Sequence, residues 1–276
     1  MSKNVFVTGS SAITGKGIAL EFARAGYNVG ITYNSNIDGA LDAVAQIEAM
    51  GQKAACYKLD TRDIEGCRKT IAQFAEDFGG IDVMVNNTGL TINEHFLKVD
   101  MDTFQKIWET NMRGCYFCGQ AAARDMVKRG TKGVIINLSS LHLQGTWPGD
   151  TMYAVTKRAI QKLTECEAYD LAEYGIRAVC LAPGWVEMGW GEKSEQAKAF
   201  HELMCSRFPI HRMVTPAELG RCAVFLSSES AGYITGATLM VDGGALLPVL
   251  QENYYLPQVD YYPAPVFTAD AGKADI

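Results

Sequence analysis

Short apolar runs alternate along the chain with longer segments in which apolar residues recur at helical spacing. The strand-like runs cover residues 5–8, 29–33, 54–59, 83–86, 134–138, 178–181 and 239–241. They are almost continuously hydrophobic, which is typical of parallel strands that helical crossovers cover on both faces. The pattern therefore predicts an α/β fold with one doubly wound parallel sheet and helices on both faces. Ligands of such folds bind beyond the carboxyl ends of the strands.

The length and composition predict one large domain. With 276 residues, 48% of them hydrophobic, the chain can fill a single core, which we assign to residues 1–246. Residues 185–215 interrupt the alternation with large apolar residues among charged ones. This composition predicts a small helical lid over the substrate, or an ordinary packed pair of amphipathic helices. Residues 247–276 hold four tyrosines and four prolines, so we expect an irregular arm that wraps the surface or bridges subunits.

The charge and the cysteine pattern exclude several classes of function. A formal net charge of -6 without clustered Lys and Arg argues against nucleic-acid binding. The chain has no secretion signal and no apolar run near the length of about 18 residues that spans a bilayer, so we expect a cytoplasmic protein with a small-molecule partner and no membrane. The eight cysteines are scattered, and neither they nor the four histidines have metal-ligand spacing. Buried free thiols and no metal site are expected.

Tyr153 and Lys157 form the most informative local pair. They stand four positions apart in a segment that we expect to be helical, which puts a phenol and an ammonium on one helix face. Because an ordinary tyrosine has a pKa of about 10, the cation must lower the pKa of Tyr153 before it can act as an acid or base at neutral pH. Ser140, thirteen positions upstream, can hydrogen-bond the reacting oxygen. The set suits interconversion of carbonyls and alcohols, although a surface pair has the same spacing.

A glycine-rich turn joins the first predicted strand to a helix that runs through residues 18–25. Gly9, Gly15 and Gly17 belong to this turn. Glycines at such a position let the backbone approach a pyrophosphate, whose charge the helix N-terminus stabilises. The turn therefore predicts a dinucleotide site, a signal that is weak when it stands alone.

In combination these features resemble the short-chain dehydrogenase/reductase family, in its single-domain branch, over residues 3–244. The motifs that carry the resemblance are T-G-x-x-x-G-x-G at 8–15, N-N-x-G at 86–89, the tetrad Asn111, Ser140, Tyr153 and Lys157, the P-G turn at 183–184, and a C-terminal signature within 225–244. The resemblance implies a Rossmann-like fold and hydride transfer between NADP(H) or NAD(H) and a secondary alcohol or ketone. It also implies a homo-oligomer, tetramer or dimer, with long helices near 103–128 and 152–174 packed between subunits.

The resemblance further implies a role for each member of the tetrad. Tyr153 would be the acid/base, and Ser140 would polarise the substrate oxygen. Lys157 would hold the ribose hydroxyls and lower the pKa of the tyrosine, while Asn111 would support a water relay to solvent. The implied cofactor-binding residues are Gly9, Ser11, Ile13, Gly15, Tyr33, Asn34, Ser35, Asp60, Thr61, Asn87, Thr88, Gly89, Tyr153, Lys157, Pro183, Gly184 and Val186.

Two positions depart from the family pattern at the cofactor cradle. Ile13 replaces the middle glycine of the first motif, so we expect the turn to differ locally or the diphosphate to shift. Met188 stands where a hydroxyl is usual after the P-G turn. These departures leave open a rival function of another class, a dinucleotide-binding sensor or scaffold without turnover. The intact tetrad argues against that rival, because a pure binder has no use for it.

The choice of cofactor depends on the end of the second strand. A carboxylate there would hydrogen-bond a ribose 2'-hydroxyl and repel a 2'-phosphate. This chain has Tyr33, Asn34 and Ser35 instead, which favours NADP(H) over NAD(H). Two observations oppose this choice. Neither Ala12 nor Asn34 is basic, and Asp38 could supply the carboxylate if the strand ended later.

The substrate is the least determined feature. We expect the pocket to be formed by His142, Gln144, Trp147, Trp185, Met188 and Trp190. This mixture of hydrogen-bonding and aromatic groups favours a sugar or polyol. A bulkier cyclic ketone also fits, as does a 3-oxoacyl-carrier substrate, although an acidic chain is a poor match for an acidic carrier protein.

Overall fold

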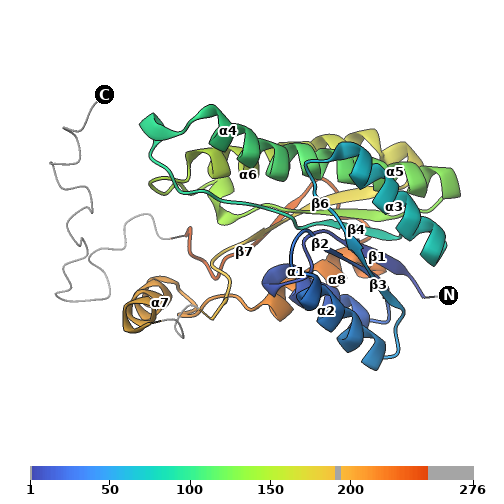
Figure 1. Cartoon of the computed structure of the whole chain (residues 1–276), viewed down its shortest axis with the longest axis horizontal. Coiled ribbons are helices and arrows are strands. Elements are labelled where there is room, and N and C mark those ends of the chain that lie inside the picture. Colours follow the sequence, from blue (N-terminus) through green and yellow to red (C-terminus); the bar gives the residue numbers. More distant parts are fainter. Residues whose placement is uncertain (1, 190–193, 248–276) are drawn as a thin grey trace.

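Seven parallel strands form one sheet in the computed structural model, which describes residues 2–189 and 194–247 (Figure 1). The strands are β1 (Asn4–Val7), β2 (Asn28–Tyr33), β3 (Ala54–Lys58), β4 (Val83–Asn86), β5 (Val134–Leu138), β6 (Arg177–Pro183) and β7 (Thr238–Val241). Their order across the sheet is β3-β2-β1-β4-β5-β6-β7, so the chain reverses its direction of travel between β1 and β4. The predicted α/β fold is confirmed, and each strand lies within two residues of its expected position.

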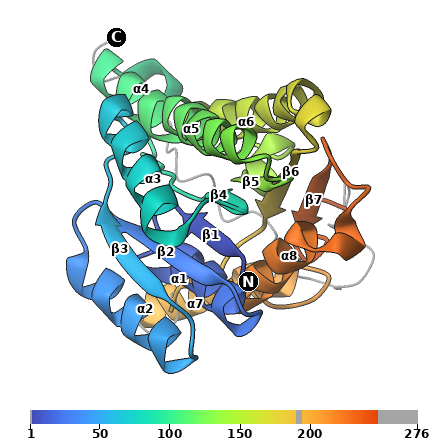
Figure 2. The same ribbon diagram turned by 90° about the vertical axis from the view of Figure 1, so that its right-hand side faces the viewer.

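Helices cover both faces of this sheet, as Figures 1 and 2 show. One face carries α1 (Ile13–Arg24), α2 (Ile37–Ala49) and α8 (Pro216–Ser227), and the other carries α3 (Ile64–Phe78), α5 (Gly114–Arg129) and α6 (Thr151–Asp170), with α4 (Met101–Trp108) against α6. Each face has its own buried apolar cluster, centred on Phe22 and Ile18 on the first and on Phe74 and Met126 on the second. A fully buried side chain of this size contributes about 1.5–3 kcal/mol.

The long helix expected at 103–128 is one continuous helical run that changes its hydrogen-bond pattern in the middle. After α4, residues Glu109–Arg113 form a π-helical turn, and α5 follows without a break. Such a turn inserts one residue into the helical ladder and is frequent at functional sites. The sequence period could not show it, because apolar spacing is too coarse to reveal one extra residue. The helix expected at 152–174 is α6 followed by a one-turn helix, Ala172–Tyr174.

Residues 185–215 contain one helix within the part that the structure describes, α7 (Glu195–Arg207). In Figure 1 it stands off from the body of the sheet. Within the segment, Val186 forms a bridge with Val214, and the rings of Trp185 and Phe200 are in contact with centres 5.9 Å apart. Ser194 caps α7 by accepting from the Ala197 N–H. The expected arm at 247–276 lies outside the described residues except for Leu247.

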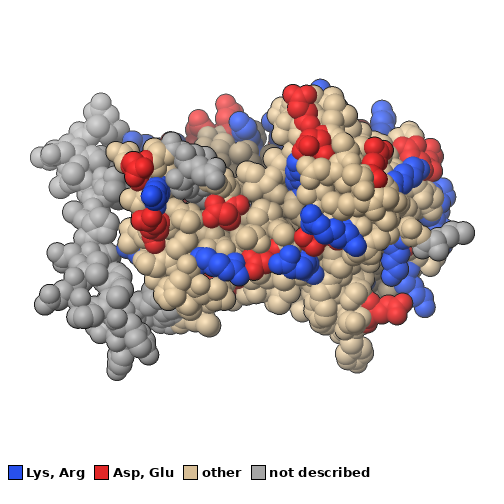
Figure 3. Space-filling model, turned by 90° about the horizontal axis from the view of Figure 1, so that it is seen from below, with Lys and Arg blue, Asp and Glu red and all other residues tan. Residues whose placement is uncertain are grey.

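The surface and the thiols add two findings. Figure 3 shows acidic and basic side chains interspersed over the face formed by α1, α2 and α8. All eight cysteines are free, and four of them are buried, as the composition predicts.

None of the helices in 2–189 and 194–247 has the length and apolar character required to cross a membrane.

Candidate active site

A cavity of about 750 Å³ opens at the carboxyl ends of the central strands. Its walls come from the turn after β1, the residues after β4, the end of β5, the start of α6 and the loop after β6. Because the chain reverses between β1 and β4, the loops that follow these strands diverge to opposite faces and leave a crevice. The described part of the chain contains no cluster of three His, Cys, Asp or Glu side chains able to hold a metal ion.

Three members of the sequence-predicted tetrad line this cavity: Ser140, Tyr153 and Lys157. Ser140 ends the segment after β5, while the other two lie in the first half of α6. Lys157 is 3% exposed, and its Nζ donates to the Leu138 carbonyl at 2.9 Å and lies 5.3 Å from the centre of the Tyr153 ring. The Ser139 hydroxyl donates to the Lys157 carbonyl at 2.8 Å, which ties α6 to the end of β5. The ammonium is thus fixed beside the phenol by contacts to the sheet.

Asn111 is fully buried in the π-helical turn behind these groups. Its Nδ2 donates to the Leu90 carbonyl at 2.9 Å and to the Thr156 hydroxyl at 3.1 Å, and its Oδ1 accepts from the Leu90 N–H at 2.7 Å. The Thr156 hydroxyl in turn donates to the Tyr153 carbonyl at 2.7 Å. Asn111 therefore joins the loop after β4 to the helix that carries the tyrosine and the lysine. A Cβ at Gly89 would lie 3.3 Å from the Lys157 Nζ and 3.8 Å from the Asn111 Oδ1, so the glycine leaves room between them.

The turn after β1 is stapled to the loop after β4. The Thr8 hydroxyl accepts from the N–H groups of Asn87 and Thr88, at 2.9 and 3.0 Å, and the Asn87 Nδ2 donates to the carbonyls of Thr8 and Gly9. A Cβ at Gly15 would lie 2.3 Å from the Gly9 carbonyl oxygen, so this close approach requires a glycine. The glycine-rich turn is therefore tightly folded against the helix that it starts.

The start of α1 fits an anionic group. Ala12 precedes the helix and no side chain caps its first N–H groups, whereas Asn36 and Asp63 cap α2 and α3 through side-chain oxygens. The first turn of α1 also carries no acidic residue and lines the cavity. Uncapped N–H groups and the positive end of the helix dipole favour a phosphate at this point. The residues present therefore fit the diphosphate of a dinucleotide.

Ile13 shows how the chain tolerates its departure from the glycine pattern. We expected the turn to differ locally or the diphosphate to shift. In the structure Ile13 has a φ of +39°, in the region that favours glycine, and its side chain is 46% exposed at the cavity wall. A β-branched residue in this conformation costs on the order of 1–3 kcal/mol. The isoleucine therefore carries backbone strain.

The residues expected around the adenosine half lie beyond the wall of the cavity. Asn34 and Ser35 are exposed after β2, which ends at Tyr33, so Asp38 falls in the first turn of α2 and not at the strand end. Arg62 holds the Asp60 carboxylate in a two-pronged ion pair, and this contact lowers the pKa of Asp60. Two further expected residues do not line the cavity: Ser11 and Thr61, the latter buried against Gly114.

The loop after β6 closes the cavity opposite α1. Pro183, Gly184, Val186 and Met188 all line it. A Cβ at Gly184 would lie 2.7 Å from the Asp242 Cα, so close packing against the residue after β7 fixes this turn. Met188 is 37% exposed and places a thioether at the position where the family pattern has a hydroxyl.

The expected substrate residues divide into three groups. His142, Trp147, Trp185 and Met188 line the cavity. Gln144 does not: it is exposed at the end of the one-turn helix Leu141–Leu143, where the chain has already turned toward the surface. Trp190 lies outside the described residues.

Sequence reasoning missed Asp150, which lines the cavity beside His142. The His142 Nδ1 lies 3.1 Å from the Ser140 hydroxyl and its Nε2 lies 3.1 Å from the Asp150 carboxylate. Burial lowers the pKa of His142, while Asp150 acts in the opposite direction. The available signal was an acidic residue three positions before the tyrosine, but its partner could not be identified without the fold.

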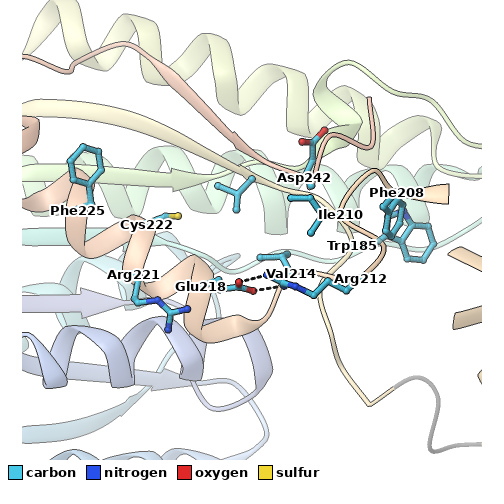
Figure 4. Close-up of a pocket in the computed structure, with 12 residues that line it drawn as sticks. Trp185, Phe208, Ile210, Arg212, Val214, Glu218, Arg221, Cys222, Phe225 and Asp242 are labelled. Atoms are coloured by element: carbon cyan, nitrogen blue, oxygen red, sulfur yellow. Dashed lines mark hydrogen bonds and ion pairs between the residues drawn. The ribbon is translucent and has the colours of Figure 1, made fainter. Parts of the chain in front are cut away.

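A second hollow of about 510 Å³ lies between α8 and the segment that follows α7 (Figure 4). Its main charged contact is the pair of hydrogen bonds that Arg212 donates to the Glu218 carboxylate, at 2.6 and 2.8 Å, which lower the pKa of Glu218 to about 2. Glu218 also accepts from the N–H of Thr215, as the acidic member of the capping box of α8. These charged groups therefore stabilise the N-terminus of α8. The candidate catalytic residues line the cavity of about 750 Å³ instead.

Comparisons with known proteins agree with this fold. A family model described as enoyl-(acyl carrier protein) reductase matches residues 10–245. An L-rhamnose 1-dehydrogenase (NAD(P)(+)) from Sphingomonas sp. (strain SKA58) is 36% identical over 244 residues, which are 88% of this chain and 95% of that protein. The structure is similar to a short-chain type dehydrogenase/reductase from Mycobacterium marinum, with a TM-score of 0.81, 30% identity and coverage of 89% and 96% of the two chains. It is also similar to a gluconate 5-dehydrogenase from Burkholderia cenocepacia J2315 in complex with NADP and tartrate, with a TM-score of 0.83, 31% identity and coverage of 90% and 97%.

Proposed function

This chain belongs to the short-chain dehydrogenase/reductase family and is an NAD(P)-dependent oxidoreductase; we propose that it oxidises a secondary alcohol of a sugar or polyol, or reduces the corresponding carbonyl. The observation that carries the proposal is the convergence of Ser140, Tyr153 and Lys157 on one cavity whose opposite wall is the uncapped start of α1. A nicotinamide cofactor, when bound, supplies or accepts the hydride.

Each residue of the tetrad has a task that follows from its place. Tyr153 gives a proton to the substrate oxygen in reduction and takes one in oxidation. Lys157, with its ammonium 5.3 Å from the ring centre, stabilises the negative charge that the phenol acquires when it loses its proton. Ser140 hydrogen-bonds the same substrate oxygen. Asn111, through Leu90 and Thr156, holds the loop after β4 and α6 at a fixed separation.

The sugar or polyol class rests on the cavity wall and on relatives. His142, Asp150 and Asn93 line the cavity together with Trp147 and offer hydrogen bonds to several hydroxyl groups beside an aromatic face. Among the relatives compared, one is named for L-rhamnose and one for gluconate. The test is a panel of sugars, polyols, cyclic alcohols and their ketones, followed by the absorbance of the reduced nicotinamide. Turnover confined to cyclic ketones would reject the sugar class, and tight cofactor binding without any turnover would favour the sensor.

NADP(H) is the cofactor that we propose as preferred. The strand end carries Tyr33 and no carboxylate, and Lys58 lies beside Tyr33 in register on β3, where an ammonium suits a 2'-phosphate. The KM for NADP should therefore be lower than the KM for NAD, and Lys58→Gln should narrow the difference. Lys53→Gln, an exposed change at the other end of β3, is the control. A strong preference for NAD would contradict the proposal.

We also propose that the protein is a homo-oligomer, a tetramer or dimer, that buries the outer face of α5 and α6. This face exposes Tyr116 and Val127 on α5 and Val155 and Tyr169 on α6, beside a hollow of about 590 Å³. Light scattering should give a mass of two or four chains. Tyr116→Lys should shift it toward the monomer, whereas a monomeric wild type would contradict this arrangement.

A further inference from the structure

A chain of hydrogen bonds runs from the catalytic serine through a histidine to a carboxylate. The Ser140 hydroxyl lies 3.1 Å from the His142 Nδ1, and the His142 Nε2 lies 3.1 Å from the Asp150 Oδ2. The side chains of His142 and Asp150 are each 14% exposed. The imidazole is held between Trp147 and Tyr153, with ring centres 4.4 and 5.0 Å away. The histidine therefore has little freedom to turn.

The carboxylate selects one tautomer of the neutral histidine. An ionised Asp150 can only accept hydrogen bonds, so the His142 Nε2 must carry the proton. Its Nδ1 is then a bare acceptor, and the Ser140 hydroxyl must donate to it. The serine oxygen already accepts from the His142 backbone N–H at 3.3 Å. What Ser140 offers to a substrate in this state is a lone pair, which suits the O–H of an alcohol.

Protonation of His142 reverses the role of the serine. Both ring nitrogens then donate, Nε2 to Asp150 and Nδ1 to the Ser140 oxygen. The serine proton is released and can point to the substrate, where it suits a carbonyl oxygen. The same three side chains thus have two hydrogen-bond patterns that differ by one proton on the imidazole.

We propose that Asp150 and His142 are positioning residues that decide whether Ser140 accepts from an alcohol or donates to a carbonyl, so that a neutral His142 favours bound alcohol and a protonated His142 favours bound carbonyl. This inference rests on the proposed function of the site. The reaction itself balances without the histidine: the alcohol O–H proton turns from the Ser140 oxygen to the Tyr153 oxygen, which takes it, the alcohol C–H would leave with its electron pair as hydride to an oxidised nicotinamide, and a carbonyl forms. His142 keeps its proton throughout the step and acts only through Ser140.

The groups that face the imidazole come from α6 with its N-terminus and from the loop after β4. Asp150 and the Lys157 ammonium face it from α6 and its N-terminus, and Tyr153 contacts the ring edge from the same helix. Thr91 and Asn93, in the loop after β4, are neutral and hold the Asp150 Oδ1. Burial lowers the pKa of His142, Asp150 opposes the shift, and Lys157 adds to it. The neutral ring and the alcohol-accepting serine are therefore favoured relative to a histidine in water.

Binding is the quantity that reveals this coupling. An enzyme cannot change the overall equilibrium between alcohol and carbonyl, so a ratio of rates in the two directions is not a clean measure. The affinities of dead-end complexes are a clean measure, because cyclohexanone with the oxidised cofactor and cyclohexanol with the reduced cofactor cannot react. By linkage, a ligand that prefers protonated His142 must raise the pKa of His142, and one that prefers the neutral ring must lower it.

Asp150→Asn is the informative variant. Thr91 and Asn93 both donate to the Asp150 Oδ1, so the amide oxygen of the variant stays with them and its NH2 faces the His142 Nε2. The NH2 requires an acceptor there, which moves the ring proton to Nδ1 and releases the Ser140 hydroxyl at every pH. Asp170→Asn, an exposed change at the far end of α6, is the matched control, and His142→Gln removes the titration.

Nitrogen-15 NMR of the imidazoles in the full-length protein tests the arrangement without turnover, with His142→Gln to assign the signal. The expected result is an Nε2–H ring in the wild type and in Asp170→Asn, and an Nδ1–H ring in Asp150→Asn. With saturating probes, cyclohexanone should raise the pKa of His142 and cyclohexanol should lower it. Between the pKa of His142 in the protein without a probe and its higher pKa in the cyclohexanone complex, the affinity for cyclohexanone should fall by up to about tenfold per pH unit. This pH dependence should vanish in His142→Gln and Asp150→Asn.

The outcomes separate this inference from the proposed function. An Nδ1–H ring in an active wild type, an unchanged tautomer in Asp150→Asn, or equal pH slopes in wild type and His142→Gln would overturn the inference alone. An Nε2–H ring in a protein that turns over no alcohol or ketone would overturn the proposed function, and with it the role of the serine.

Discussion

The catalytic half of the cavity and its nucleotide half differ in how fully their groups are satisfied. In the catalytic half, Asn111, Ser140 and Lys157 are buried, and each has a hydrogen-bond partner within the protein. In the nucleotide half, α1 starts without a side-chain cap and Ile13 has a positive φ. The first half is set before substrate arrives, as electrostatic catalysis requires, whereas the second leaves donors open for a ligand.

A buried polar layer supports the catalytic half from behind. The Asn137 Nδ2 donates to the Thr164 hydroxyl at 3.0 Å and to the Glu167 carboxylate at 2.6 Å, and its Oδ1 accepts from Asn86 at 2.8 Å. Burial raises the pKa of Glu167 to about 7. Helix α6 therefore carries the lysine of the proposed active site in its first half and a carboxyl group that is costly to ionise in its second.

The largest expected effect comes from a substitution in the catalytic half. Tyr153→Phe removes the phenol oxygen that we propose exchanges the proton, so turnover should fall by at least about a hundredfold. Calorimetry should show dinucleotide binding close to that of the wild type. Tyr233→Phe is the control, because Tyr233 is a fully exposed tyrosine that does not line the cavity. Substantial activity in Tyr153→Phe would reject the assignment of this residue as acid/base.

The next effect concerns stability and comes from the polar layer. The folded protein favours protonated Glu167, so the contribution of this group to stability is fully present below pH 4.5, its ordinary pKa, and is lost as pH rises through about 7. Glu167→Gln keeps an oxygen for Asn137 and cannot ionise. It should be more stable than wild type well above pH 7, by at most about 3 kcal/mol, and should show little difference near pH 4.5.

Thermal unfolding at the two pH values measures the effect of Glu167→Gln. Glu165→Gln is the control, since Glu165 forms an exposed ion pair with Lys162 on the same helix. A gain in stability that is equal at both pH values would show that ionisation of Glu167 is not its cause.

The smallest expected effect comes from removing the backbone strain at Ile13 in the nucleotide half. Ile13→Gly removes the β-branched side chain from a φ of +39° and should stabilise the protein by about 1 kcal/mol, with a lower Kd for the dinucleotide because the phosphate site is less obstructed. Ile37→Gly is the matched control, because Ile37 is the first residue of α2, is 45% exposed and has no positive φ. That control should lose up to about 1 kcal/mol. A destabilised Ile13→Gly would show that this side chain contributes more through packing than it costs in strain.

Much of the fold could be predicted from the sequence because its strands are short, apolar and separated by helical periods. The candidate tetrad, the glycine-rich turn and the loops after β4 and β6 could be located from their spacing along the chain. The start of the following helix could not, because α1 begins at Ile13 and includes Gly15 and Gly17, which were expected in the turn. The π-helical turn around Asn111 was not, because one inserted residue does not change the apolar pattern. The position of Gln144 was misjudged, because a one-turn helix redirects the chain within four residues of Ser140.

Local spacing along the chain was enough to identify the candidate reactive groups: a tyrosine and a lysine one helical turn apart, a serine after a strand, and a glycine-rich turn before a helix. How those groups are connected electrostatically depends on the fold. The meeting of His142 with Asp150, the hold of Thr91 and Asn93 on that carboxylate, and the left-handed backbone of Ile13 all depend on where loops close. Hydrogen-bond roles depend on separations of a few tenths of an ångström between residues from different elements, and no local pattern along the chain encodes those separations.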